Sequence, residues 1–417
     1  MRTSNRELHL VGMLVSFSVM SYIQRVMMSI AGPEIMKQYS IPAPDMGLVY
    51  SAFVISYSLT MVPGGGFVDK YGPKAVLTAV GLLTAAFTGL TALAGSPGLG
   101  AVIGVVPALI VMRLGLGVGT SPLYPACGRM IHNWISPSKR GRVWGWTAAG
   151  AGFGGAITPV ALKPLLASYS WPAAFVSGGL LTFALVALWM ATVSDYPSAS
   201  RRPATAAGDR PKVPWKPLFA NRNLRLLTIG YFAVDYFEYI FFYWLFYYFG
   251  EVRRVGPDKS ALYTSYLFLA FMIMSPLGGF ASDVLGKRYG RFQGRKIVSI
   301  VGLALSGLLL YAGIEAVDSA VSVTLLSLAL GFASAADVPY WATVIDLSGD
   351  QSGAAGGIMN AGGNLGGAFA PYVTPLLAVS FGWSAGLLVG CLAAVIGAVV
   401  WFFIDPKQRI EVAGAPQ

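Results

Sequence analysis

A long internal repeat constrains the fold more than any other feature of this sequence. Residues 145–171 return as residues 357–383 at a constant spacing of 212, with the same Gly, Ala, Pro and Trp residues at eight positions. Such a repeat indicates that the chain is built from two related halves. In membrane proteins, paired halves of this kind are typical of transporters, in which two bundles move about a central site.

Composition places this repeat in a membrane. Of the 417 residues, 55% are hydrophobic and 11% are charged, whereas soluble domains have about 25% charged residues. Twelve apolar stretches reach the length of roughly 20 residues that a helix needs to cross the hydrocarbon core. The sequence therefore predicts an all-α membrane protein with twelve transmembrane helices in two pseudo-symmetric bundles of six. The expected spans are 9–31, 46–67, 75–95, 101–131, 143–167, 172–193, 224–249, 260–282, 297–315, 320–346, 354–379 and 384–404.

The segment before the seventh span is rich in Pro, Arg and Lys and lacks apolar periodicity, which indicates a linker. We expect an N-terminal bundle at 1–194, a cytoplasmic linker at 195–223, and a C-terminal bundle with a short cytoplasmic tail at 224–417. Placing the N-terminus in the cytoplasm assigns 22 of the 29 Lys and Arg residues to that side and five to the other. The positive-inside rule then predicts that both termini are cytoplasmic.

The residues needed for an enzyme or a metal centre are missing from the sequence. Cys127 and Cys391 lie in separate apolar spans, and His9 and His132 stand alone near predicted helix ends. Isolated residues of this kind do not make a metal site. The basic residues sit in short loops, so the net charge of +11 reflects topology and not nucleic-acid binding. We expect no enzymatic activity, no cofactor and no metal.

A charged turn follows the second span and recurs after the eighth. Small residues let helices approach closely in lipid, and an aspartate there can contact a helix N-terminus or a basic side chain. We expect a cytoplasmic latch that stabilises one access state; the alternative is an ordinary turn whose charges only set topology. The latch residues are Gly65, Asp69, Lys70, Gly72 and Lys74, and, with the glycines and aspartate shifted by 214, Gly279, Asp283, Gly286, Lys287 and Arg288.

Arg25 lies about two-thirds of the way across the first span, with Tyr22 on the same helical face. A buried arginine is expensive unless it is paired, and its planar fork can bind a carboxylate through two hydrogen bonds. Two hypotheses stay open at this point. Arg25 either binds an anionic substrate or forms a structural ion pair with Asp235, Glu238 or Asp337.

Two acids, Asp235 and Glu238, share one face of the seventh span. Two close carboxylates in a medium of low dielectric cannot both ionise cheaply, so one of them is expected to hold a proton. At the spacing of 214, Glu238 matches Gln24 beside Arg25, and we therefore expect Glu238 to carry the coupling proton. The alternative is that one of these acids only neutralises Arg25.

Other polar residues lie in the fourth, tenth and eleventh spans. Arg113 is expected to bond to backbone carbonyls and not to a ligand. Asp337, the third acid placed inside a span, precedes Pro339, which is expected to break its helix beside a cavity. Asn360 and Asn364, four residues apart, either bind a polyhydroxylated substrate or hydrogen-bond between helices.

Several stretches resemble the anion:cation symporter family of the major facilitator superfamily, which includes hexuronate and galactonate permeases and vesicular glutamate and sialic acid carriers. The loop after the second span resembles the superfamily signature G-x3-D-[RK]-x-G-x-[RK]. The family stretches are residues 22–25, residues 57–72, residues 124–127 with Trp134, and residues 356–367 with Pro371. Substrate contacts implied by the resemblance are Tyr22, Arg25, Tyr57 and Tyr124 in the first half, with Trp341 and Asn360 or Asn364 in the second.

The chain departs from this family at two positions. Gln24 and Thr120 stand where many members carry acids that are implicated in proton coupling. Any proton site is therefore expected elsewhere, at Asp235, Glu238 or Asp337.

These patterns predict a secondary active transporter that moves a small organic anion, a sugar acid or another carboxylate, by alternating access. We expect symport with protons, with sodium as the alternative coupling ion, by a monomer in the lipid of a bacterial inner membrane. An efflux transporter of amphipathic compounds and a membrane receptor that does not transport are the competing interpretations.

Overall fold

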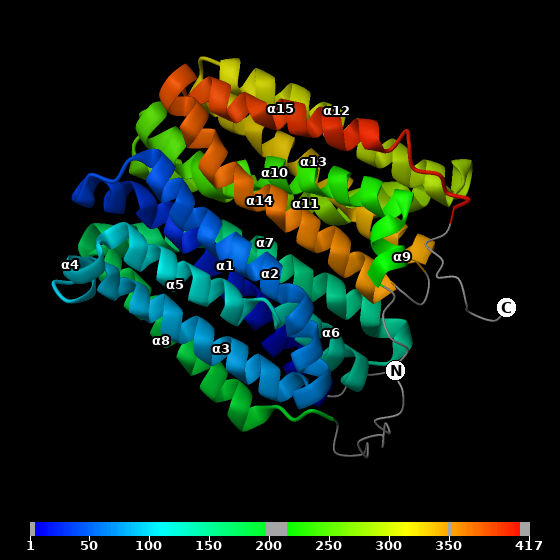
Figure 1. Cartoon of the computed structure of the whole chain (residues 1–417), viewed down its shortest axis with the longest axis horizontal. Helices are drawn as coiled ribbons and strands as arrows, with labels where there is room; N and C mark the ends of the chain where they lie inside the picture. Colours follow the sequence, from blue (N-terminus) through cyan, green and yellow to red (C-terminus); the bar gives the residue numbers. More distant parts are fainter. Residues whose placement is uncertain (1–4, 197–214, 349–351, 409–417) are drawn as a thin grey trace. The chain divides into compact units, whose positions relative to one another are not determined.

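The computed structural model describes residues 5–196, 215–348 and 352–408, and these residues form helices and the turns between them (Figure 1). The first half contains α1 (Asn5–Tyr39), α2 (Ala43–Tyr71), α3 (Pro73–Leu90), α4 (Leu99–Ile103), α5 (Val105–Thr120), α6 (Leu123–Trp134), α7 (Pro137–Ser168) and α8 (Trp171–Thr192). The second half contains α9 (Trp215–Ala220), α10 (Arg222–Tyr247), α11 (Pro257–Tyr289), α12 (Arg291–Glu315), α13 (Ser319–Ser348), α14 (Ser352–Phe381) and α15 (Trp383–Val400). Residues 197–214 of the expected linker and the tail from 409 lie outside the described residues.

Twelve spans can be traced in the described chain when α5 and α6 are taken together as one. Nine of them have both the length and the hydropathy needed to cross a membrane. The other three, α7, α10 and α14, are also long enough to cross a membrane, with 32, 26 and 30 residues. The predicted all-α membrane fold is confirmed.

Pro339 does not break its helix, so that expectation is wrong: α13 continues through it to Ser348. Pro339 cannot donate a hydrogen bond to the Ala335 carbonyl one turn earlier. Gly278 of α11 packs against that carbonyl so closely that a Cβ would lie 2.2 Å from its oxygen. Neighbouring helices that cover the freed backbone group are what allow proline inside transmembrane helices.

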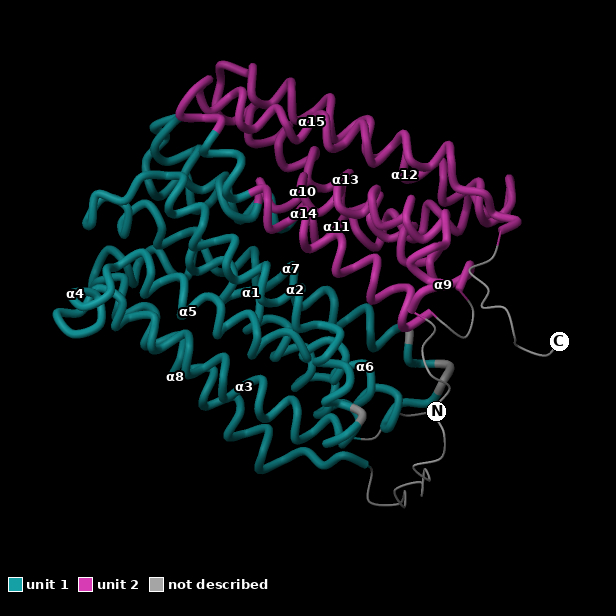
Figure 2. The backbone as a smooth tube through the Cα atoms, in the orientation of Figure 1, with its two compact units in different colours: residues 1–203, 242–269, 371–376 teal, residues 204–241, 270–370, 377–417 magenta. Residues whose placement is uncertain are grey.

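The chain divides into two compact units, shown in teal and magenta in Figure 2. Unit 1 comprises residues 1–203, 242–269 and 371–376, and unit 2 comprises residues 204–241, 270–370 and 377–417. Unit 1 therefore includes parts of α10, α11 and α14 in addition to the helices of the first half. The division into halves at 1–194 and 224–417 stays a prediction from the repeat.

Glycines of the repeat make matching helix contacts within each unit. In unit 1, a Cβ on Gly154 of α7 would lie 2.4 Å from the Val19 carbonyl oxygen of α1. In unit 2, a Cβ on Gly366 of α14 would lie 2.0 Å from the Phe232 carbonyl oxygen of α10. Only glycine allows backbones this close. The two glycines are 212 residues apart, and their two partners are 213 apart.

A second pair of contacts gives the same register. Gly178 of α8 packs against Met27 of α1, and Gly390 of α15 packs against Ile240 of α10. These partners are also 213 residues apart. The contacts therefore align α1 with α10 at a spacing of 213.

This register changes the alignment of the charged residues. At a spacing of 213, Arg25 corresponds to Glu238 and Tyr22 corresponds to Asp235. The sequence-based match of Glu238 with Gln24 is wrong by one residue, because the spacing of 214 was taken from other segments of the repeat.

Candidate functional site

Arg25 is surrounded by aromatic rings in unit 1. Its Cζ atom lies 5.1 Å from the ring centre of Tyr22, 5.0 Å from that of Phe53 and 5.2 Å from that of Tyr57. The arginine is only 5% exposed. Cation–π contacts contribute about 0.5–2 kcal/mol each. Its N–H donors lie in the guanidinium plane, where they can bind a carboxylate.

Phe53 also belongs to this cluster, although it was not among the candidates predicted from the sequence. Phe53 and Tyr57 lie one turn apart on α2, and their rings stack with centres 5.8 Å apart. Tyr124 of α6 reaches the same helix as Arg25, because its hydroxyl lies 3.2 Å from that of Ser18, one turn before Tyr22 on α1. The i, i+4 spacing of Phe53 and Tyr57 is the sequence signal that could have revealed the missing ring.

A second arginine, Arg113 of α5, is buried near the same part of α1, with 2% exposure. Its Nη1 donates a hydrogen bond of 3.3 Å to the Gln24 carbonyl oxygen, and its guanidinium lies 5.7 Å from the Phe175 ring centre. The expected bond to a backbone carbonyl is therefore present. Nε and Nη2 have no hydrogen-bond partner among the described residues. Two buried guanidinium groups make this region of unit 1 favourable for negative charge.

Three acids lie close to one another in unit 2. Glu238 of α10 interacts electrostatically with Asp337 of α13 and with Asp235 one turn earlier on its own helix. Tyr231 forms a hydrogen bond with Asp337, and its hydroxyl accepts one of 2.8 Å from Trp341 Nε1. Tyr231 was not among the sequence candidates, although spacings of four and seven place it on the face of Asp235 and Glu238.

The acid group is incompletely hydrogen-bonded. Glu238 Oε1 and Asp337 Oδ1 have no hydrogen-bond partner among the described residues, and Glu238 is 6% exposed. An isolated buried carboxylate is costly in its ionised form. Gly363 of α14 leaves room for the group, since a Cβ there would lie 2.7 Å from Asp235 Oδ2. For Glu238 and Asp337, protonation is one way to remove that cost.

Asn364 has its hydrogen bonds within unit 2. Its Oδ1 accepts a bond of 2.9 Å from the Tyr239 hydroxyl, and its Nδ2 donates one of 2.9 Å to the Asn360 carbonyl oxygen. Asn364 is 4% exposed, whereas Asn360 is half-buried. These bonds correspond to the helix-to-helix alternative for Asn364, and they leave Asn360 as the more accessible of the two amides.

The expected latch residues lie mostly on helices and not in loops. α2 continues through Gly65 and Lys70 to Tyr71, and Gly72, with a φ of 85°, makes the turn into α3. The Asp69 side chain lies outside the described residues. Lys74, in the first turn of α3, donates its backbone N–H to Asp195 Oδ1 at 2.9 Å. Asp195 therefore caps α3, a role that its position at the end of the N-terminal half did not reveal.

The second turn lies one helical turn later than the repeat predicted. Gly279, Asp283, Gly286, Lys287 and Arg288 are all within α11, and the turning residue is Gly290, with a φ of 94°. The turn after α11 is therefore made by Gly290 and not by Gly286, the residue that matches Gly72 in the repeat. Gly286 instead packs against α12, where a Cβ on Gly294 would lie 2.4 Å from the Gly286 nitrogen.

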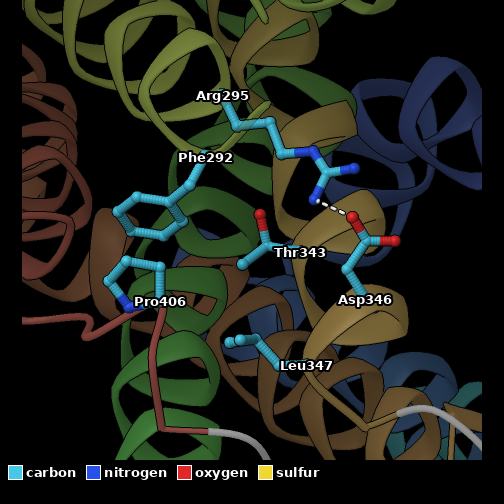
Figure 3. A pocket seen from close by; sticks show the side chains of 6 residues that line it. All are labelled: Phe292, Arg295, Thr343, Asp346, Leu347 and Pro406. Carbon is cyan, nitrogen blue, oxygen red and sulfur yellow. Dashed lines mark ion pairs between the residues drawn. The ribbon is translucent and has the colours of Figure 1, made fainter. Parts of the chain in front are cut away.

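A cavity of about 170 Å³ opens between α12 and α13 of unit 2 (Figure 3). Arg295 from the first turn of α12 forms an ion pair of 2.7 Å with Asp346 near the end of α13. The remaining lining residues are Phe292, Thr343, Leu347 and Pro406. None of these six residues is a predicted substrate residue, so this cavity does not define the candidate site.

The family model described as Major Facilitator Superfamily matches residues 14–346 and 288–417. The probable sulfoacetate transporter SauU of Cupriavidus necator is 30% identical over 96% of this chain and 94% of that protein. The hexuronate transporter of Bacillus subtilis is 29% identical over 97% of this chain and 96% of that protein.

Solved structures share the fold. A bacterial homologue of the human lysosomal transporter Spinster, in an inward-facing and occupied conformation, matches with a TM-score of 0.80 at 15% identity, covering 98% of this chain and 99% of its own. A D-xylose–proton symporter matches with a TM-score of 0.72 at 16% identity, over 96% and 99% of the two chains. The expectation of a transporter and not an enzyme is confirmed by these relatives. From its helices and from a family match over nearly its whole length, this chain belongs to the major facilitator superfamily.

Proposed function

We propose that the protein is a secondary active transporter of a small organic anion and that Arg25 binds the anionic group. The observation that carries this proposal is the buried guanidinium held between the rings of Tyr22, Phe53 and Tyr57. Sulfoacetate and hexuronates, the compounds for which two relatives are named, both carry a carboxylate. That shared group is what a planar arginine fork binds best. The substrate contacts that the resemblance implies for Trp341 and Asn360 stay predictions.

Counterflow in proteoliposomes tests this function directly. Vesicles preloaded with unlabelled sulfoacetate, glucuronate or galactarate should take up the same labelled anion without any ion gradient, because exchange needs only binding and alternating access. Efflux of an amphipathic dye, measured in parallel, tests the main alternative. Dye efflux without anion exchange would show that the protein is a drug exporter, and the absence of both activities would support a receptor.

Contacts within unit 1 suggest how one side of the transporter closes. Trp244 Nε1 of α10 donates a hydrogen bond of 2.8 Å to the Pro371 carbonyl oxygen, and Tyr243 stacks on Tyr50 of α2 with ring centres 5.0 Å apart. Gly47 of α2 approaches the same carbonyl so closely that a Cβ would lie 2.3 Å from the oxygen. We propose that these contacts form when the side opposite the cytoplasm is closed.

Gly47→Ala should therefore shift the protein toward the state that is open on that side. The added methyl meets backbone that cannot rotate away, and overpacking typically costs about 1–3 kcal/mol, which corresponds to a roughly 5- to 150-fold change in an equilibrium. Labelling of single cysteines placed on the two faces of the membrane measures this change. Gly12→Ala is the matched control, because a Cβ at Gly12 meets nothing within 4 Å. Equal labelling of wild type and Gly47→Ala would contradict the proposed closure.

If the side opposite the cytoplasm is closed in this structure, the cytoplasmic side is expected to be open, with the latch contacts not made. Asp283 is exposed in this structure, as a latch residue is in a state where its contacts are not made. Asp283→Asn and Asp69→Asn should each change the cysteine labelling pattern, because latch contacts stabilise one access state only. If neither variant changes the pattern, the two aspartates have only a topological role.

The remaining parts of the proposal concern the membrane and the coupling ion. A bacterial inner membrane with both termini in the cytoplasm is supported by the excess of Lys and Arg in the loops assigned to that side. Proton coupling through the acids of unit 2 is supported by the unpartnered carboxylate oxygens of Glu238 and Asp337.

A further inference from the structure

Tyr22, the tyrosine beside Arg25, belongs to a closed loop of four contacts within unit 1. The loop runs from α7 to Tyr22 on α1, then to Phe242 of α10, to Phe268 of α11, and back to α7. Phe242 and Phe268 lie on helices of the second half, but both belong to unit 1. Neither phenylalanine was predicted from the sequence as a site residue.

Two consecutive glycines of α7 form the ends of this loop. A Cβ on Gly154 would lie 3.1 Å from the Cβ of Tyr22, and a Cβ on Gly155 would lie 2.3 Å from Cδ1 of Phe268. Carbon atoms that are not bonded pack at about 3.5–4.0 Å, so any residue larger than glycine at position 155 would collide with the Phe268 ring. Gly155 therefore keeps open the space that this ring occupies.

The two phenylalanine rings fill the distance between α7 and Tyr22. Phe268 stacks on Phe242, with ring centres 5.2 Å apart and ring planes 19° apart. Phe242 in turn meets the Tyr22 ring at a steep angle of 76°, with centres 6.4 Å apart. Stacked and edge-to-face pairs are the arrangements that aromatic rings favour. Phe242 is 3% exposed and Phe268 is 1% exposed, so a shift of one ring displaces the next.

Tyr22 is the member of the loop that touches the candidate site. The Arg25 Cζ atom lies 5.1 Å from its ring centre, so a rotation of the ring changes its contact with the guanidinium. The Tyr22 side chain is only half-buried. Side chains choose among staggered rotamers, and a half-buried ring is fixed in one rotamer where neighbouring groups block the others. Phe242 is such a neighbour.

We propose that Phe242 and Phe268 are positioning residues of the anion site and hold the Tyr22 ring against the Arg25 guanidinium. In this role they act through Tyr22 and not on the anion itself. A binding group that is already in place raises affinity, because less conformational freedom is lost on binding. The inference rests on the proposed function, since it takes Arg25 and Tyr22 as the groups that bind the anion.

Phe268→Leu should weaken anion binding by about 2- to 10-fold, the range expected for the loss of one aromatic pair. Leucine keeps an apolar side chain but offers no flat ring to stack on Phe242. Binding of sulfoacetate and glucuronate to purified protein measures the change. Phe249→Leu is the matched control, because Phe249 is fully buried, also lies in unit 1, and packs on Tyr248 and Tyr263. It should bind the anion like wild type.

Gly155→Ala tests the same loop from its other end. The added methyl pushes the Phe268 ring toward Phe242, and anion affinity should fall by at least about 5-fold. Gly145→Ala on the same helix is the control, because a Cβ at Gly145 meets nothing within 4 Å.

A double variant separates a positioning role from a general packing defect. Phe268→Leu should have no further effect on anion affinity in a Tyr22→Leu background, because the ring through which it acts is then absent. Additive losses in the double variant would overturn the proposal. Wild-type affinity in Phe268→Leu, or an equal loss in Phe249→Leu, would also overturn it.

A spectroscopic readout keeps this inference apart from the proposed function. If wild type binds no anion, the proposed function fails, and fluorine NMR of a fluorotyrosine placed at position 22 decides about positioning alone. Phe268→Leu and Gly155→Ala must each shift that resonance, whereas Phe249→Leu and Gly145→Ala must leave it in place. A resonance that does not move in Phe268→Leu would show that the phenylalanine column does not hold Tyr22.

Discussion

Arg25→Lys should lose anion binding by about 10- to 100-fold. A charge-assisted hydrogen bond contributes about 1.5–3 kcal/mol, and each 1.4 kcal/mol is about tenfold in affinity. Lysine keeps the charge, but it cannot offer the two parallel donors that arginine presents to a carboxylate, and its compact ammonium group would contact the rings of Tyr22, Phe53 and Tyr57 differently. Binding of sulfoacetate, glucuronate and galactarate to purified protein, followed by thermal shift, measures the change.

Arg295→Lys is the matched control for this substitution. Arg295 makes a partly exposed ion pair with Asp346 in unit 2, and such pairs contribute only about 0–1 kcal/mol to stability. This variant should bind the anion like wild type. Wild-type affinity in Arg25→Lys would show that Arg25 does not bind the carboxylate, and would restore the hypothesis of a structural ion pair.

Glu238→Gln should abolish accumulation driven by a pH gradient and leave counterflow intact. A gradient of one pH unit is worth about 1.4 kcal/mol per proton, so wild-type protein should concentrate the anion by up to about tenfold for each proton moved. Glutamine has nearly the same shape but cannot release a proton. Exchange moves no net proton, so it should survive. Uptake and counterflow in the same proteoliposomes give both readings.

Two further variants decide whether the effect belongs to Glu238. Asp346→Asn removes an acid from the same unit but at the exposed ion pair with Arg295, and it should accumulate the anion normally. Asp337→Asn tests the neighbouring acid whose Oδ1 lacks a hydrogen-bond partner among the described residues. If Asp337→Asn loses accumulation while Glu238→Gln keeps it, the proton is carried by Asp337 and not by Glu238.

The helical fold could be predicted from the sequence because transmembrane length and hydropathy are local properties of the chain. The repeat also pointed to real contacts, since Gly154 and Gly366 occupy equivalent helix crossings. The register between α1 and α10 could not be predicted in the same way. It is set by which carbonyls those glycines meet, Val19 and Phe232, and neither partner is itself a repeated residue.

Similar limits apply to the turns and the candidate site. α11 continues for one more turn, to Tyr289, before Gly290 turns the chain. In the sequence Gly286 still matches Gly72, because a glycine is needed there for packing against Gly294. Tyr22, Arg25 and Tyr57 could be named from the resemblance. The grouping of Tyr231 with Asp337 could not, because these residues lie on α10 and α13 and meet only through tertiary packing.

The alignment of Arg25 with Glu238 bears on how this chain arose. The two halves share the glycines at which helices touch, yet at one equivalent depth the first half has a cation and the second an acid. An ancestor with two identical halves would have had the same charge at both positions. The opposite charges of Arg25 and Glu238 would then have appeared during or after duplication, while the glycines at the helix crossings were retained. The helix crossings are therefore common to both halves, whereas the charge at this depth is specific to each half.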